Sequence, residues 1–177
     1  VNPGYKAYNR LVDSNFAGPD GGKFVDEYPV ETVPLSGDVD KAKEYLAAAM
    51  EELGYSDVSQ LPQLELITWD TSEQKLLLET IIDQWKQNLG LENIQLTQYV
   101  IGTAIGSFYD LSYDLFAITW ETDVLPTDIM EAMVTGGEVN YGIWSDAQFD
   151  SLVEQAINEL EPDKQAELTA QAEQIFL

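Results

Sequence analysis

The sequence predicts an α/β fold with a small, mostly parallel sheet of about three strands, flanked by five or six helices. Two observations carry this prediction. Segments with apolar residues spaced by three and four alternate with short apolar or alternating segments, as in parallel sheets whose strands are joined by helices. In addition, 45% of the 177 residues are hydrophobic and 11% are aromatic, which is enough to fill a core.

The regular elements are expected to begin after an irregular lead-in. Residues 1–37 contain Pro and Gly at many positions and show no periodicity, so we expect this segment to lie across another part of the protein. A helix capped by Asp38 or Asp40 is expected next, and Gly54 ends it. Apolar and polar residues then alternate over 64–69, which predicts a strand.

A second helix and strand complete a strand-helix-strand unit. Thr71 resembles the first residue of a capping box, in which its side chain accepts a hydrogen bond from the backbone amide of Gln74. The helix that it opens ends at Gly90, and the next strand is expected over 93–100. Because such crossovers are right-handed and join parallel strands, these two strands should be parallel.

A third strand is expected over 113–120, after a short helix that follows residue 100. Its run 115–118 is apolar on both faces, as in a strand that is covered on both sides. This pattern favours a central position in the sheet.

Three further helices are expected over 127–135, over 145–160 and from Pro162 onward. Ser145 begins a second Ser-x-x-Gln box, and Pro162 occupies the first turn, where its missing amide costs no hydrogen bond. The last helix has no stop signal before Leu177, and the chain begins without Met. We therefore expect a piece that is truncated relative to a longer protein.

Composition excludes several classes of function. Eight basic and 32 acidic residues give a net charge of -24, which repels nucleic acids and anionic membranes. Cys and His are absent, so disulfides, thiol nucleophiles, imidazole bases and structural zinc sites are excluded. No cofactor or metal is expected, and no run of 18 or more apolar residues predicts a membrane span.

Candidate site residues lie near the expected strand ends and in one later aromatic cluster. In open α/β sheets, ligands bind beyond the carboxyl ends of the strands. Trp69 ends the first strand, and Trp120 and Asp123 follow the third, where they would supply an apolar wall and an anchor for an ammonium group. Tyr141 and Trp144 belong to the later cluster. From the residues alone, the alternative is that these aromatics fill the core and Asp123 caps a turn.

The order of motifs along the chain resembles the C-terminal part of the extracellular solute-binding proteins of family 5, which serve oligopeptide and dipeptide ABC importers. The resemblance covers residues 36–177. The motifs that carry the resemblance are, in order along the chain, the helix that starts with 38–46 and ends at 53–55, Leu89-Gly90, Tyr113-Asp114-Leu115-Phe116, Trp120-x-x-Asp123-x-x-Pro126, Asn140-Tyr141-Gly142-Ile143-Trp144-Ser145, Phe149-Asp150-Ser151-Leu152 and 172–177.

The resemblance implies one lobe of a type II periplasmic-binding-protein-like fold. Residues 38–177 would form this ligand-binding lobe, truncated at both ends relative to the full-length protein. Asp123 would pair with the free α-amino group of a peptide, with Trp120 beside it. Val124-Leu125 leads straight to Pro126, which makes this loop one residue shorter and less aromatic than the family pattern. Ligand type therefore stays open.

By this resemblance the protein would be a non-catalytic component of an importer, located outside the cell or in the periplasm and tethered as a lipoprotein when full length. Its partners would be a peptide or other small solute, the permease subunits and the N-terminal lobe of the same chain. The alternatives are a binder of an oligosaccharide or metal chelate on the same fold, an acidic protein-interaction scaffold, and a carboxylate-dependent glycosidase.

Overall fold

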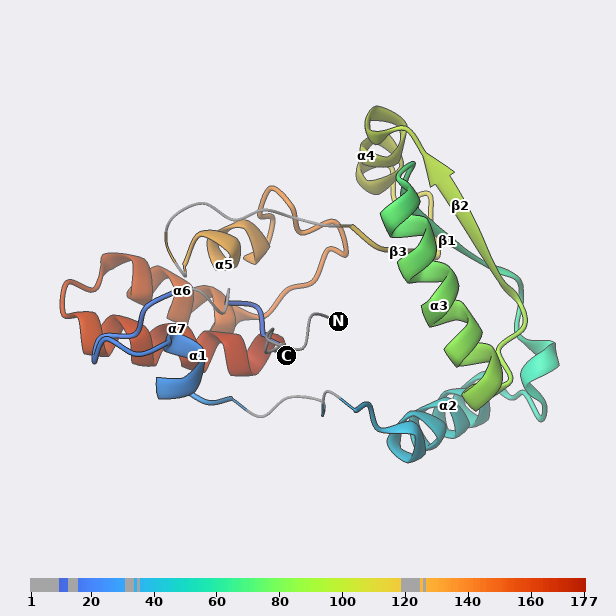
Figure 1. Cartoon of the computed structure of the whole chain (residues 1–177), viewed down its shortest axis with the longest axis horizontal. Helices are drawn as coiled ribbons and strands as arrows, with labels where there is room; N and C mark the ends of the chain where they lie inside the picture. Colours follow the sequence, from blue (N-terminus) through green and yellow to red (C-terminus); the bar gives the residue numbers. More distant parts are fainter. Residues whose placement is uncertain (1–9, 13–15, 31–33, 35, 119–124, 126) are drawn as a thin grey trace. The chain divides into compact units, whose positions relative to one another are not determined.

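A computed structural model of the chain describes residues 10–12, 16–30, 34, 36–118, 125 and 127–177. The chain forms two compact units (Figure 1). Unit 1 contains Val1–Gly37 and Glu121–Leu177, and unit 2 contains Asp38–Trp120. None of the described helices combines the length and the hydropathy needed to span a bilayer.

Unit 2 contains a parallel sheet of three strands, β1 (Leu64–Trp69), β2 (Ile94–Tyr99) and β3 (Leu115–Phe116). The expected α/β fold with a small parallel sheet is confirmed. The strand order is β2-β1-β3, so β1 is central among the described strands and the central position expected for the third strand is wrong. The apolar run 115–118 indicates a strand whose two faces are both covered by other parts of the protein. Covered faces do not determine whether a strand has a neighbouring strand at each of its edges.

Three α-helices and a 3-10 turn, Val58–Gln60, accompany the sheet: α2 (Val39–Leu53), α3 (Ser72–Leu89) and α4 (Ile101–Tyr109). Asp38, not Asp40, caps α2 by accepting a hydrogen bond from the Lys41 amide at 2.9 Å. Thr71 caps α3 as expected, with 3.2 Å between its hydroxyl and the Gln74 amide. Both helices end at glycines with positive φ, as expected.

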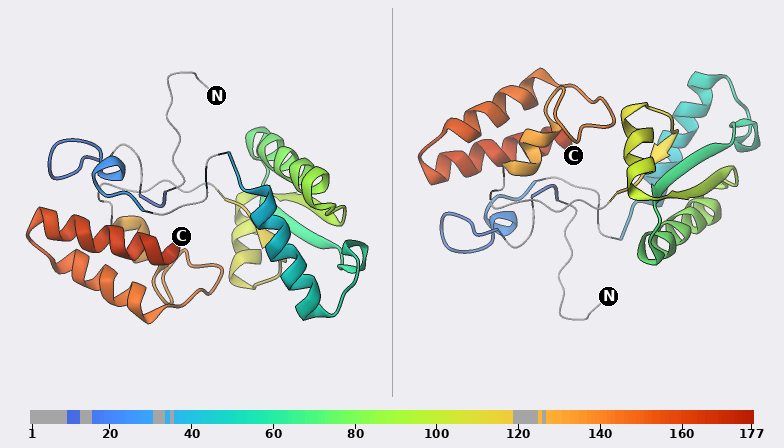
Figure 2. Two further views of the ribbon diagram at one scale, coloured as in Figure 1. Left: turned by 90° about the horizontal axis from the view of Figure 1, so that it is seen from below. Right: turned by 90° about the horizontal axis from the view of Figure 1, so that it is seen from above.

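Helices α3 and α4 lie on opposite faces of the sheet (Figure 2). The chain moves from β1 to the neighbouring β2 through α3, then returns past β1 to β3 through α4. Two right-handed crossovers in opposite directions place their helices on opposite faces. Ile67 of β1 is fully buried, as are Ala104 and Phe108 of α4, while Leu78 of α3 is 3% exposed.

Unit 1 is helical in its described part, with α1 (Phe24–Glu27), α5 (Asp128–Met133), α6 (Ala147–Asn158) and α7 (Pro162–Phe176). Helices α6 and α7 pack side by side (Figure 1). Residues from distant parts of the chain form the core, including Val12, Phe24, Met130, Phe149 and Ala172.

Two details of unit 1 differ from expectation. Asp146, not Ser145, caps α6, because its carboxylate accepts hydrogen bonds from the amides of Gln148 and Phe149 at 2.9 and 2.8 Å. The lead-in also contains local order in addition to α1, namely an antiparallel bridge between Ala17 and Lys23. Pro162 occupies the first turn of α7, as expected.

Candidate functional site

The carboxyl ends of the three parallel strands meet at one edge of unit 2. β1 ends at Trp69, directly opposite Tyr99, the last residue of β2. In the strand order β2-β1-β3, the chain leaves β1 toward one side of the sheet to form β2 and then crosses to the other side to form β3. The position between β1 and β3 is therefore a topological switch point, and ligands of open α/β sheets bind in the crevice outside such a point. This edge is therefore the candidate functional site.

Hydrogen bonds fix the loop that follows β1. The Asp70 amide donates to the Tyr99 carbonyl at 2.8 Å. The side-chain amide of Gln98 donates to the carbonyl oxygens of Trp69 at 3.3 Å and Thr71 at 3.0 Å. Gln98 on β2 thus holds the end of β1 and the start of α3 together, so β2 fixes the backbone on either side of Asp70.

The end of β3 is also tied to β1. The fully buried Thr68 hydroxyl donates to the Ala117 carbonyl at 2.7 Å, and the Ala117 amide donates to the Ile67 carbonyl at 3.1 Å. The loop that follows β3 therefore leaves from a fixed point beside the switch. Trp120 and Asp123 follow in the sequence and lie outside the described residues.

Trp69 is half-buried against an aromatic cluster. Its ring meets Phe108 edge to face, with 6.5 Å between centroids, and Phe108 in turn contacts Tyr113 and Phe116. Burial raises the pKa of the Tyr113 phenol. Packing on one side holds the Trp69 indole in place while part of it stays accessible, and a contact of this ring with ligand stays a prediction.

Tyr141 and Trp144 lie in unit 1, in a loop organised by Asn140. The Asn140 side-chain amide donates to the carbonyl oxygens of Met133, Val134 and Trp144, at 3.2, 3.0 and 2.6 Å, and its oxygen accepts from the Trp144 amide at 3.0 Å. One short side chain therefore closes the loop on itself and onto the end of α5.

The rings of this loop turn inward. Trp144 meets Phe149 and Phe176 edge to face, with centroid distances of 4.9 and 5.2 Å, and Tyr141 is only 7% exposed. Trp69 belongs to unit 2, so the structure describes these candidates in separate units. The packing of Trp144 identifies a structural role for it, and its use in binding stays a prediction.

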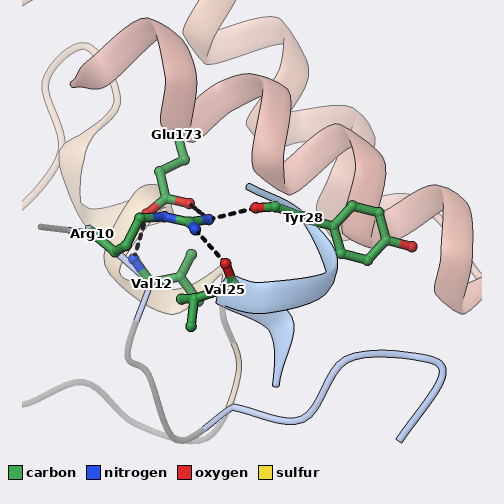
Figure 3. Close-up of polar contacts among 5 residues, drawn as sticks. All are labelled: Arg10, Val12, Val25, Tyr28 and Glu173. Carbon is green, nitrogen blue, oxygen red and sulfur yellow. Dashed lines mark hydrogen bonds and ion pairs between the residues drawn. The ribbon is translucent and has the colours of Figure 1, made fainter. Parts of the chain in front are cut away.

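The most deeply buried ionic contact among the described residues joins Arg10 to Glu173 of α7 (Figure 3). Their side chains are 6% and 0% exposed, and the nearest nitrogen and oxygen are 2.6 Å apart. Arg10 also donates to the carbonyl oxygens of Val25 and Tyr28 at 3.0 and 2.9 Å, and the second Glu173 oxygen accepts from the Val12 amide at 3.0 Å. The pair thus binds the lead-in and α1 to the last helix.

Sequence reasoning singled out neither residue of this pair. The sequence does contain a signal for Glu173. Ala166, Thr169 and Glu173 recur at the three-and-four spacing of one helix face, and Ala172 lies beside Glu173. All four residues are buried in α7. A charged residue on such a face requires a buried partner. Nothing in the sequence names Arg10 as that partner, since the two are 163 positions apart.

The described residues contain no group of three or more acidic side chains arranged to hold a metal ion.

No protein-family model matches the chain. Sequence comparison finds the oligopeptide-binding protein OppA of Bacillus subtilis, 29% identical over 143 residues that cover 79% of this chain and 26% of OppA. It also finds the dipeptide-binding protein DppE of the same organism, 26% identical over 173 residues that cover 97% of this chain and 31% of DppE.

The chain is similar to peptide-binding components of ABC transporters. This confirms the resemblance drawn from the sequence motifs. The substrate-binding domain of an oligopeptide ABC transporter from Bacillus anthracis has the same fold, with a TM-score of 0.81 and 25% identity over 100% of this chain and 34% of that one. The chain spans only about a quarter to a third of the length of these relatives.

Proposed function

We propose that this chain is part of the substrate-binding component of an ABC importer, which captures oligopeptides or dipeptides outside the cell and delivers them to a permease. The observation that carries the proposal is the similarity to OppA, supported by the shared fold over the whole chain. The proposed role is binding and not catalysis. Its partners are a peptide, the permease subunits and the remaining lobe of the full-length protein.

The proposed site is the carboxyl edge of the sheet at the β1/β3 switch point. Asp123 pairs with the free α-ammonium group of the peptide, Trp120 forms the wall beside it, and Trp69 contributes from the end of β1. The anchored ends of β1 and β3 support this assignment, because they hold the flanking backbone before ligand arrives. A carboxylate in a desolvated site gains more from an ammonium partner than one in bulk water.

Tyr141 and Trp144 are proposed as further ligand contacts, secondary to the role of Trp144 in the core of unit 1. The proposed location is extracellular or periplasmic, with the full-length protein tethered as a lipoprotein. This location follows from the transporter role of the relatives, since a component that feeds an importer works on the outer side of the membrane.

Titration calorimetry on the full-length protein tests the ammonium anchor. The probes are trialanine and N-acetyl-trialanine, which differ by the charged amino group. Asp123→Asn should weaken trialanine binding roughly thirtyfold to 150-fold, since a buried charge pair is worth about 2 to 3 kcal/mol. Acetylation should weaken binding to the parent protein by a similar factor and have little further effect on the variant.

Asp40→Asn is the matched control, because it removes the same charge from an exposed position in the first turn of α2, which precedes all three strands in the chain. It should leave affinity unchanged. Equal affinity of the parent protein and Asp123→Asn for trialanine contradicts the anchor, and failure of the parent protein to bind any peptide contradicts the proposed function.

A further inference from the structure

A pocket of about 430 Å³ lies between α5 and α6 in unit 1. We name it the α5–α6 pocket. Its lining combines apolar and acidic side chains, completed by Thr135 and Asn158. The apolar members are Val134, Val153 and Ile157, and the acidic members are Glu131, Asp150 and Glu154.

The apolar side chains form a continuous support for a ligand. Val153 is 2% exposed and belongs to the core of unit 1, whereas Ile157 is 41% exposed one helical turn further along α6. A pocket of this size falls in the range of about 300 to 1,000 Å³ that is typical of binding sites. An aliphatic chain laid over these residues would remove apolar surface from water.

The acidic side chains have no cationic partner in the described part of the chain. Glu131 and Glu154 are exposed, and the ion pairs between described residues include neither of them nor Asp150. The sequence explains this, because it has no Lys or Arg between Lys86 and Lys164. The pocket thus lies in a long stretch of chain that carries only negative charge.

Asp150 is held in position by the backbone. Its carboxylate accepts a hydrogen bond from the Thr135 amide at 2.9 Å, which ties α6 to the segment after α5. One acid of the pocket is therefore fixed, while the two exposed glutamates can adjust around a ligand. The combination suits a group with an aliphatic stem and a cationic head, since an anion is repelled and a neutral alkyl group leaves the acids unpaired.

We propose that the α5–α6 pocket binds a lysine side chain from a basic segment of a partner protein. The methylene stem lies on Val153 and Ile157, and the ammonium group pairs with the exposed carboxylates of Glu131 and Glu154. Charge complementarity selects a protein segment as the occupant, because a net charge of -24 attracts a basic surface over a longer range than it attracts one isolated amine. The described residues that line the pocket do not include the proposed peptide anchor, Asp123.

Methyl NMR of the full-length protein, labelled at Ile and Val, tests this assignment. The probe is acetyl-Gly-Lys-Gly-Lys-Gly-amide, whose blocked ends remove the free α-amino group that Asp123 is proposed to bind. The Val153 and Ile157 methyl signals should shift, and the shift should weaken with added salt. The same peptide with norleucine in place of lysine keeps the stem without the charge and should bind at least fivefold more weakly.

Two charge variants locate the interaction. Glu131→Gln with Glu154→Gln should weaken lysine-peptide binding about fivefold to tenfold, the effect of two exposed ion pairs. Glu138→Gln with Glu167→Gln removes the same net charge from exposed positions outside the pocket and should change affinity less than twofold.

Equal losses in the two double variants overturn the proposal, because they show attraction by net charge alone. Equal binding of the norleucine peptide also overturns it. Titration with 1,5-diaminopentane tests whether the pocket takes its alkylammonium group from a protein segment or from a free amine. If the free diamine binds the pocket as tightly as the peptide, the assignment to a protein segment is wrong.

Discussion

The two units of this chain are built in different ways. Unit 2 is one continuous stretch, Asp38–Trp120, in which α3 packs against α2 and β2, and α4 packs against β1 and β2. Unit 1 joins Val1–Gly37 to Glu121–Leu177, and its buried ion pair links positions 163 residues apart. The comparison teaches that unit 2 is held by contacts within one stretch of chain, whereas unit 1 adds, to the local packing of α6 on α7, contacts between segments far apart in sequence.

The largest predicted effect is on the long-range contact of unit 1. Glu173→Ala leaves the Arg10 guanidinium buried without its charge partner, which should lower the free energy of unfolding by about 3 to 5 kcal/mol. Urea denaturation measures the loss. Hydrogen exchange should show lost protection in α1, α6 and α7, with the strands of unit 2 unchanged.

A double variant controls for the size of that effect. Arg10→Met with Glu173→Leu removes both charges, so it should destabilise less than Glu173→Ala alone. If the double variant is equally destabilised, the loss comes from packing or backbone contacts and not from an unpaired buried charge.

The next largest effect is expected in the core of unit 2. Ile67 is fully buried in the central strand, so Ile67→Ala should cost about 2 to 4 kcal/mol through lost burial and a residual cavity. Hydrogen exchange should report the loss in β1, β2 and β3, with α6 and α7 unaffected. Equal losses of protection in both units would contradict the division of the chain into two compact units.

Helix caps should have similar, smaller effects in both units, because a cap is a local contact. Thr71→Ala in unit 2 and Asp146→Ala in unit 1 should each cost about 1 kcal/mol in chemical denaturation. Ser145→Ala is the matched control for Asp146→Ala and should cost less, since Ser145 does not cap α6. A larger loss for Ser145→Ala would restore the original interpretation of the Ser-x-x-Gln box.

The smallest effect concerns the turn between α6 and α7. Glu159 accepts hydrogen bonds from Lys164 and from the amides of Glu161 and Leu160, which lower its pKa from 4.5 to about 2. Because the pKa is lowered in the folded state, the stability that Glu159 contributes is present above pH 4.5 and is lost as the pH falls toward about 2.

Glu159→Gln isolates this contribution. Denaturation midpoints of the variant and the parent protein should differ near neutral pH, and the difference should shrink as the pH falls from about 4.5 to about 2. A difference that stays constant over this interval would show that ionisation of Glu159 does not stabilise the turn.

Most of unit 2 could be predicted from the sequence because its signals are local. Thr71 and Gly90 mark the two ends of α3, and alternation over 64–69 marks β1, so a window of a few residues suffices for each. The sheet order could not be predicted in the same way. Apolar residues in the run 115–118 report burial, but the position of β3 at the edge depends on which strand it joins.

Unit 1 was less predictable because its stabilising contacts are distant in sequence. Pro162 marked the start of α7, but no local pattern joins Arg10 to Glu173 or shows that Asp146 competes with Ser145 for the cap. At the candidate site, Trp69 could be placed at the end of its strand. The roles of Trp120 and Asp123 rest on the family resemblance, since no periodic pattern in the sequence assigns a role to either residue.

Native mass spectrometry of the gently purified full-length protein tests the central claim, which is peptide capture. The account predicts a series of adduct masses that differ by amino-acid residues, with the series lost or reduced in Asp123→Asn. A single discrete adduct, such as a sugar or a metal chelate, would contradict the peptide assignment. A protein that carries no adduct and ignores added peptides would contradict the binding role itself.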